Sequence, residues 1–98
     1  MSSKCLIKIG KYTQIGPFCQ FNDQDHSFDK NELIMNQKAI IKPIIIGEDC
    51  WFGSGVRVLK GIIIGKGCVI GAGSIVTKNI PNYEVWAGNP AKYLKKRI

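Results

Sequence analysis

Large apolar residues recur every six positions along the second half of the chain. In steps of six from position 46, every residue is large and apolar: Ile46, Phe52, Val58, Ile64, Ile70 and Val76. Four of the six residues that follow them are glycine. The residues two positions before them are mostly small or β-branched: Ile44, Cys50, Val56, Ile62, Cys68 and Ser74. Residues two apart on a strand share a face, so we expect both sets to point into one interior.

The same phase appears earlier, at Ile9, Ile15 and Phe21. A fixed short period is typical of a β-solenoid, in which each short strand packs on the coils before and after it. The sequence therefore predicts an all-β, parallel β-helix built from hexapeptide repeats. We expect the glycine after each large residue to supply the dihedrals of a sharp corner.

The glycines of "IIIGKGCVIGAGSIV", residues 62–76, could alternatively cradle a phosphate group. A dinucleotide-binding loop requires the spacing G-x-G-x-x-G between a strand and a helix. Gly65, Gly67 and Gly71 do not have this spacing, and no amphipathic helix follows Gly73. We therefore interpret this stretch as part of the solenoid wall.

The repeat is interrupted once. Phe21 and Ile46 are 25 positions apart, which is not a multiple of six, and the stretch between them begins with polar and charged residues. We predict an inserted loop at about residues 24–42. A loop that projects from a rigid scaffold is a common place for functional residues.

The end of the chain has a different character. The repeats continue to Ile80, and Pro81 ends them. Asn89 followed by Pro90 is typical of a helix start, so we predict a short C-terminal helix at about residues 90–97. The length of 98 residues fits a single domain covering residues 1–98.

The small size of the chain favours an oligomer. A small domain buries a low share of its surface, and the first coil of a short solenoid exposes strand edges. Three cysteines (Cys19, Cys50 and Cys68) fall on the small inward position, and no C-x-x-C pair exists. They indicate free thiols in a reducing compartment, so we expect a cytoplasmic location. The sequence shows no signal peptide and no apolar run long enough for a membrane span.

The net charge of +7 favours an anionic partner. Four of the fourteen basic residues lie in the last seven positions: Lys92, Lys95, Lys96 and Arg97. They could form a solvated tail, as charge runs often do. We expect no nucleic-acid partner, because no nucleic-acid-binding motif is present. A cofactor with several phosphate charges fits the basic residues as well.

His26 is the only histidine and lies where the repeat opens into the loop. Histidine is the side chain best suited to accept a proton near neutral pH, although a surface loop histidine is an equally simple interpretation. Asp25, Asp29 and Glu32 could orient it or could only make the loop soluble. No second residue completes a nucleophilic triad, which suggests direct transfer with the base activating the substrate.

Four features, taken together, resemble the left-handed β-helix hexapeptide acyltransferases. They are "IGPFCQFNDQDHSFD", the long repeat block from "KPIIIGEDCWFGSG" to "VIGAGSIVTKNIP", the terminal "VWAGNPAKYLKKR", and the loop length between the first two. The galactoside and maltose acetyltransferases and the sugar O-acetyltransferases of polysaccharide synthesis are most similar. The left-handed winding is implied by the resemblance, because parallel crossovers are usually right-handed.

The resemblance implies an acetyl-CoA-dependent O-acetyltransferase without a metal, acting on a sugar or similar small acceptor. It implies a homotrimer with active sites between subunits and His26 as the general base. A backbone N–H would stabilise the oxyanion. The implied contacts to acetyl-CoA are Trp51, Ser54, Ala72, Thr77, Lys78, Lys92 and Lys95. Relatives often have arginine where this chain has Lys92 and Lys95, and lysine lacks bidentate geometry.

The chain departs from these relatives at its N-terminal end, where they carry extra coils or helices that contact the acceptor. The acceptor therefore does not follow from the resemblance. Two alternatives stay open: a non-catalytic hexapeptide-repeat trimer that serves as an assembly or binding module, and an N-acyltransferase acting on an amino sugar. A carbonic-anhydrase-like metalloenzyme fits poorly, since it needs several histidine ligands and the chain has one.

Overall fold

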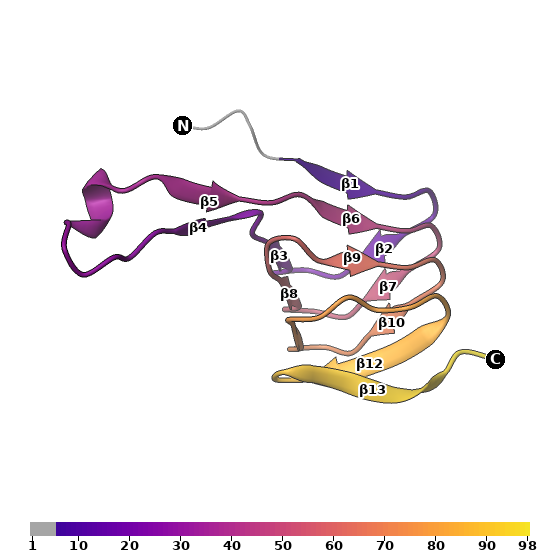
Figure 1. Cartoon of the computed structure of the whole chain (residues 1–98). Coiled ribbons are helices and arrows are strands. Elements are labelled where there is room, and N and C mark those ends of the chain that lie inside the picture. Colours follow the sequence, from indigo (N-terminus) through magenta and orange to yellow (C-terminus); the bar gives the residue numbers. More distant parts are fainter. Residues whose placement is uncertain (1–5) are drawn as a thin grey trace.

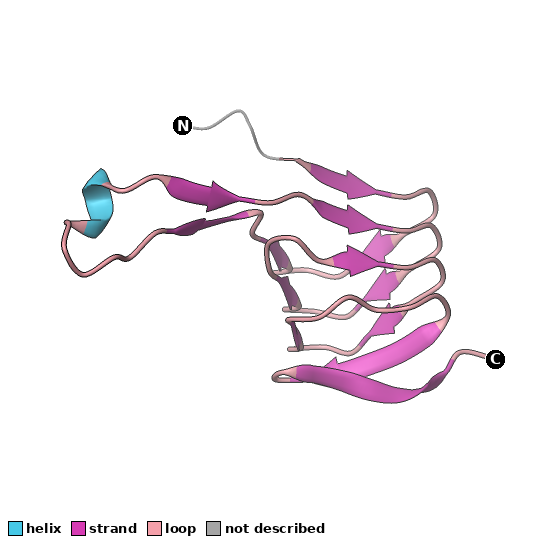
Figure 2. Ribbon diagram, viewed as in Figure 1, coloured by secondary structure: helices cyan, strands magenta, loops and turns pink. Residues whose placement is uncertain are grey.

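The structure is a computed structural model and describes residues 6–98. Cys5 lies outside the described residues. The strands are short and follow one another around a coil (Figures 1 and 2). Their bounds are β1 Ile7–Ile9, β2 Gln14–Ile15, β3 Gln20–Phe21, β4 Gln24–His26, β5 Ala39–Ile41, β6 Ile44–Ile46, β7 Trp51–Phe52, β8 Arg57–Val58, β9 Ile63–Ile64, β10 Val69–Ile70, β11 Ile75–Val76, β12 Glu84–Gly88 and β13 Ala91–Lys96.

Three sheets form the walls of the coil. Sheet A has the order β1-β6-β9, sheet B the order β13-β12-β10-β7-β2, and sheet C the order β11-β8-β3. All pairings within them are parallel except that of β12 with β13. The predicted all-β, parallel β-helix is therefore confirmed.

The strand register gives the size of each coil. Trp51 pairs with Val69, 18 positions later, so a coil consists of three hexapeptides. Ile15 pairs with Phe52, 37 positions later, because an excursion lies between the first and second coils. The difference of 19 positions equals the length of the stretch 24–42. In that stretch β4 and β5 pair antiparallel, with a 3₁₀ turn at Ile34–Asn36 between them.

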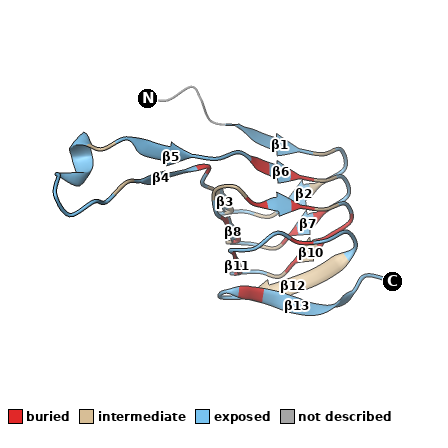
Figure 3. Ribbon diagram, in the orientation of Figure 1, coloured by how far each residue is buried: buried red, intermediate tan, exposed pale blue. Residues whose placement is uncertain are grey.

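The two inward residues of each repeat form the core. All twelve residues of the block from 44 to 76 that were predicted to point inward are buried (Figure 3). The first coil is less covered, because nothing among the described residues packs on its outer side. Ile7, Ile9 and Ile15 are 37–43% exposed although they occupy the same repeat positions. The predicted exposed edge is thus observed on β1 and β2.

The glycines after the large residues have another role than the one predicted. A Cβ atom added to Gly53 would lie 2.6 Å from the backbone nitrogen of Ala72, and one on Gly47 would lie 2.7 Å from that of Lys66. These glycines therefore allow two coils to approach closely. The left-handed corner residue comes two positions later, as at Asp49 (φ 56°). In the next repeats the corner residues are Gly55, Gly61, Gly67 and Gly73, with φ of 71–74°.

The predicted C-terminal helix at 90–97 is wrong. The chain instead makes an antiparallel hairpin, in which β12 pairs with β10 and β13 forms the edge of sheet B. Asn89 and Pro90, joined by a cis peptide bond, lie between the paired residues Gly88 and Ala91. Asn89 and Pro90 therefore mark a turn and not a helix start. Pairing with β12 provides hydrogen-bond partners for the backbone of β13. No helix within residues 6–98 is long and apolar enough to cross a membrane.

Candidate functional site

His26 lies on an arm that projects from the coil. The arm consists of β4, the 3₁₀ turn and β5, and extends sideways from the body (Figure 1). His26 ends β4, pairs with Ala39 and is exposed. It lines a hollow of about 210 Å³ together with Gln24, Asp25 and Ala39. Nothing else in residues 6–98 lines that hollow, so within this copy the imidazole faces only its own arm.

The acidic residues near His26 have other partners. The Asp25 carboxylate lies 3.3 Å from the Lys60 ammonium. The Asp29 carboxylate accepts a 2.8 Å hydrogen bond from the Asn31 N–H and so shapes the tip of the arm. Neither carboxylate forms a hydrogen bond with His26 in the part of the chain that the structure describes.

Asp23 fixes the base of the arm, although the sequence analysis did not single it out. It is 3% exposed, and its carboxylate accepts a 2.8 Å hydrogen bond from the Leu6 N–H. Its carbonyl accepts one from the Lys42 N–H, also at 2.8 Å. Asp23 thereby joins the two ends of the excursion to the first coil. The sequence did contain a signal for this role, because Asp23 stands at the position where the repeat stops.

Two of the predicted cofactor residues share one row on the outer face of sheet B. Trp51 pairs with Val69, Val69 with Val85, and Val85 with Lys95. These residues alternate with the buried row of Phe52 and Ile70, so their side chains point outward. Trp51 is 60% exposed. The row runs over three strand spacings, roughly 14 Å, from an aromatic ring to a cation.

Two other predicted residues lie together at the corner between sheets B and C. Ser54 and Ala72 occupy the same place in successive coils, and the Gly73 N–H donates a 2.8 Å hydrogen bond to the Ser54 carbonyl. The hairpin continues this corner, because the Gly88 N–H donates to the Ser74 hydroxyl at 3.0 Å. Lys92 pairs with Ala87 just beside it.

Thr77 and Lys78 lie elsewhere, just after β11, at the opposite end of sheet C. The corner at Gly73 and the strand β11 lie between Ala72 and Lys78, so the two residues are at the two ends of that strand. One copy of the chain therefore presents three separate groups. They are the sheet B face with its adjoining corner, the far corner of sheet C, and the arm with His26.

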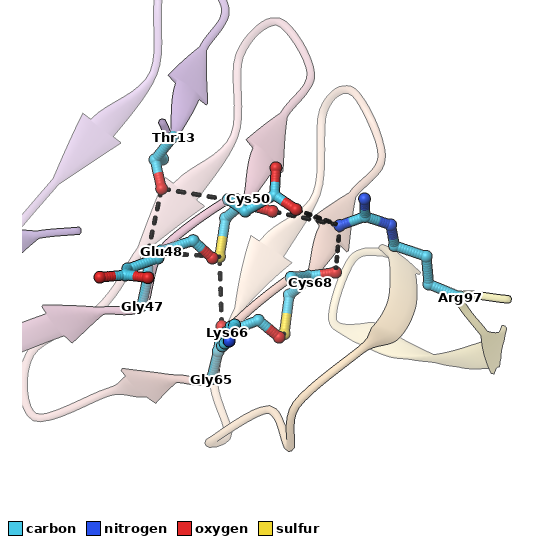
Figure 4. A network of polar contacts seen from close by, with 10 residues as sticks. Thr13, Gly47, Glu48, Cys50, Gly65, Lys66, Cys68 and Arg97 are labelled. Carbon is cyan, nitrogen blue, oxygen red and sulfur yellow. Dashed lines mark hydrogen bonds and ion pairs between the residues drawn. The ribbon is translucent and has the colours of Figure 1, made fainter. Parts of the chain in front are cut away.

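A second hollow, of about 300 Å³, adjoins Trp51 on the side of the corner between sheets A and B. Arg97 closes it. One terminal nitrogen of its guanidinium donates to the carbonyls of Asp49 and Gly67 at 3.2 and 3.1 Å and lies 3.1 Å from the Asp49 carboxylate. Figure 4 shows the rest of the guanidinium pointing away from these acceptors. Tyr12, Gln14, Cys50 and Val69 also line the hollow.

Tyr12, Gln14 and Arg97 were not predicted as site residues from the sequence. Gln14 pairs with Trp51 and so begins the outward row of sheet B. The repeat phase contained this information, because each residue directly before a large inward residue points outward. No cluster of three or more His, Cys, Asp or Glu side chains in residues 6–98 is placed to hold a metal ion.

The comparisons with known proteins agree with this architecture. Residues 43–78 match the family model described as the hexapeptide repeat of succinyl-transferase. A probable acetyltransferase of Mycobacterium tuberculosis is 41% identical over 92 residues, which are 93% of this chain and 31% of that protein.

Two solved structures have the same fold. A galactoside acetyltransferase in complex with coenzyme A is 36% identical, with a TM-score of 0.88, over 96% of this chain and 46% of that one. A hexapeptide-repeat acetyltransferase of Vibrio cholerae, complexed with acetyl coenzyme A, is 35% identical, with a TM-score of 0.84, over 92% of this chain and 49% of that one.

The chain thus spans about half the length of these two structures, and 31% of the M. tuberculosis relative. Within that span, the similarity covers both the repeats and the terminal hairpin. Residues 43–78 therefore carry the hexapeptide repeat, and the chain has the left-handed β-helix fold of these hexapeptide-repeat acetyltransferases.

Proposed function

We propose that the protein is an acetyl-CoA-dependent O-acetyltransferase that acts on a hydroxyl of a sugar or similar small acceptor. The observation that carries this proposal is the row on sheet B. It joins Trp51 to Lys95 across the apolar side chains of Val69 and Val85. A ligand with an apolar arm and an anionic end fits such a row, since Lys95 meets phosphate as a point charge. Two solved relatives hold coenzyme A or acetyl coenzyme A.

The separation of the predicted residues supports a site between copies of the chain. Ser54 and Ala72 lie at one end of sheet C, and Thr77 and Lys78 lie at the other. A single ligand can meet both groups when two copies place opposite ends of this sheet side by side. Such a head-to-tail contact between copies can close into a ring, and the resemblance implies a ring of three. The arm of one copy would then bring His26 to the sheet B face of its neighbour.

The proposed reaction is a direct transfer. His26 removes the proton from the acceptor hydroxyl, and the oxygen attacks the carbonyl carbon of the acetyl thioester. Backbone N–H groups at the corner of Ser54 and Ala72 are the candidates to stabilise the oxyanion that forms. The carbon–sulfur bond then breaks, the ester is released, and the proton passes from the imidazolium to the thiolate of coenzyme A.

The first experiment is a calorimetric titration of acetyl-CoA into the purified protein, with its mass in solution measured on the same sample. Saturable binding near one site per chain is expected. Lys95→Ala should weaken it by about tenfold, because a charged contact to phosphate is lost. Lys8→Ala removes the same charge from β1, outside sheet B, and should leave binding unchanged. A folded protein that does not bind acetyl-CoA would instead support a non-catalytic assembly module.

The second experiment follows thiol release in the presence of galactosides, maltose and amino sugars. His26→Ala should lower kcat by at least about a hundredfold, since general base catalysis typically contributes 10²- to 10⁴-fold. Its matched control is Lys30→Ala, which changes an exposed residue of the same arm. Unchanged turnover in the His26 variant would refute the mechanism. Transfer to the amine alone would make the protein an N-acyltransferase.

A further inference from the structure

The hollow beside Trp51 has the chemistry of a saccharide site. Two aromatic residues, Trp51 and Tyr12, line it and are 60% and 79% exposed. Exposed aromatic faces suit the apolar C–H side of a sugar ring, because they offer large contact area to a partner that keeps its hydroxyl groups wet. The volume of about 300 Å³ is at the lower end of the range for small-ligand sites.

Polar side chains line the same hollow. Gln14 has an amide with both donors and an acceptor, and Asp49 contributes carboxylate oxygens. Arg97 contributes donors in a fixed fork, since its other terminal nitrogen is already held by Asp49 and Gly67 (Figure 4). Planar groups of this kind can bond to neighbouring hydroxyls. The ion pair with Asp49 offsets the charge of Arg97, which favours a neutral polyhydroxylated ring over an anion.

The hollow also lies at the end of the row on sheet B that is farthest from Lys95. From Lys95 the row passes Val85 and Val69 to Trp51, and its next member is Gln14 on β2. If the phosphate end of acetyl-CoA lies at Lys95, its acyl end points towards Trp51. A ring held by Tyr12 and Gln14 is then the next group along the same line.

We infer that the hollow formed by Tyr12, Gln14, Asp49, Trp51 and Arg97 binds the sugar ring of the acceptor. This inference rests on the proposed function, because it takes that row as the path of acetyl-CoA. It assigns acceptor recognition to the first coil of this chain. It also makes Trp51 a wall shared by the acceptor and the acyl group.

The test uses the fluorescence of Trp51. The chain has two tryptophans, so Trp86→Phe leaves Trp51 as the only one. This variant is titrated with methyl β-galactoside and with maltose, and with glycerol as an acyclic control. Both sugars should change the fluorescence in a saturable way, whereas glycerol should not. Tyr12→Ala should weaken sugar binding by about tenfold, and Tyr12→Phe should restore most of it, because the ring is the main contact.

The matched control is Phe18→Ala. Phe18 lies one repeat after Tyr12, has the same left-handed backbone (φ 62° against 65°) and is also exposed. This variant should bind the sugars as the parent does. Equal losses in both variants, or no response of Trp51 to either sugar, would overturn the inference.

Acetyl-CoA titration separates this inference from the proposed function. Tyr12→Ala should bind acetyl-CoA normally. Normal acetyl-CoA binding without any sugar response would refute the saccharide site and leave the proposed function standing. Sugar binding that depends on Tyr12, without acetyl-CoA binding, would refute the proposed function.

Discussion

Two kinds of glycine hold this coil together, and they should respond differently to substitution. Gly47 is one of those that lie against the next coil, where an added Cβ would meet the Lys66 nitrogen at 2.7 Å. We expect Gly47→Ala to lower the free energy of unfolding by about 2 kcal/mol, the usual cost of overpacking a tight contact. Urea denaturation would measure the loss.

The control is a glycine of the other kind. Gly73 has a left-handed backbone, and an added Cβ there meets nothing within 4 Å. Phe18 occupies the equivalent corner two coils earlier with the same hand of backbone (φ 62°). Gly73→Asn should therefore cost less than about 1 kcal/mol, because asparagine tolerates this conformation. Equal losses in the two variants would contradict the distinction.

The inward cysteines are the second residue-scale feature that can be tested. The thiols of Cys50 and Cys68 are at most 2% exposed and donate 3.1 Å hydrogen bonds to the carbonyls of Gly65 and Pro81. The neighbouring Cys50 and burial raise the pKa of Cys68 above its usual range. The hydrogen bond with Cys68 lowers the pKa of Cys50 to about 7, so burial alone protects that thiol. We expect both thiols to resist iodoacetamide in the folded protein, because alkylation requires an exposed thiolate.

Mass spectrometry of peptides after alkylation would locate the modified residues. Both cysteines should become reactive once urea unfolds the chain, which serves as the internal control. Rapid modification of either one at neutral pH without denaturant would mean that the core opens locally.

At the scale of elements, the periodic part of the fold was predictable and the terminal part was not. The six-residue period placed all twelve inward positions of the block from 44 to 76. A repeat is predictable because each position sees the same neighbours one coil away. The hairpin at 84–96 depends instead on pairing with β10, a contact that no local pattern encodes. The site followed the same division. The repeat phase alone makes Gln14 point outward, but its position beside Trp51 follows only when the residues of the arm are left out of the count.

The hairpin should depend on Arg97 for its attachment. Arg97 follows β13 and bonds to Asp49 and to the Gly67 carbonyl, which lie in two different coils. We expect Arg97→Ala to lower the free energy of unfolding by about 1 kcal/mol, since the guanidinium is partly exposed and its ion pair is screened.

Lys96→Ala is the comparison, because Lys96 is itself exposed and makes a single ion pair, at 3.4 Å, with the Glu84 carboxylate, which keeps a hydrogen bond from the Trp86 indole N–H. It should cost less than about 0.5 kcal/mol. Chemical denaturation of both variants at low and high salt would separate the effects. The loss at Arg97 should persist in salt, because two of its bonds go to carbonyls. A larger loss of unfolding free energy in the Lys96 variant would mean that contacts between β12 and β13 hold the hairpin, and not its attachment to the coils through Arg97.

At the scale of the whole molecule, the single chain exposes more surface than a compact protein of its mass. Its accessible surface is 6665 Å², whereas a compact monomer of 10.9 kDa would expose about 5,600 Å². The arm exposes large apolar side chains, since Phe28, Leu33 and Met35 are 66–82% exposed. Apolar side chains held this far from the core favour contact with another copy.

The arm should therefore control the oligomeric state. We expect the double variant Leu33→Glu, Met35→Glu to convert a trimer into monomers, because each carboxylate would have to enter an apolar contact without a partner. Sedimentation equilibrium would measure the mass. Lys30→Glu adds a carboxylate at the tip of the same arm without removing apolar surface, and should leave the mass unchanged. A double variant that stays trimeric would place the interface on the coil itself. His26 would then have to reach acetyl-CoA within its own chain, across the separation that the single copy shows.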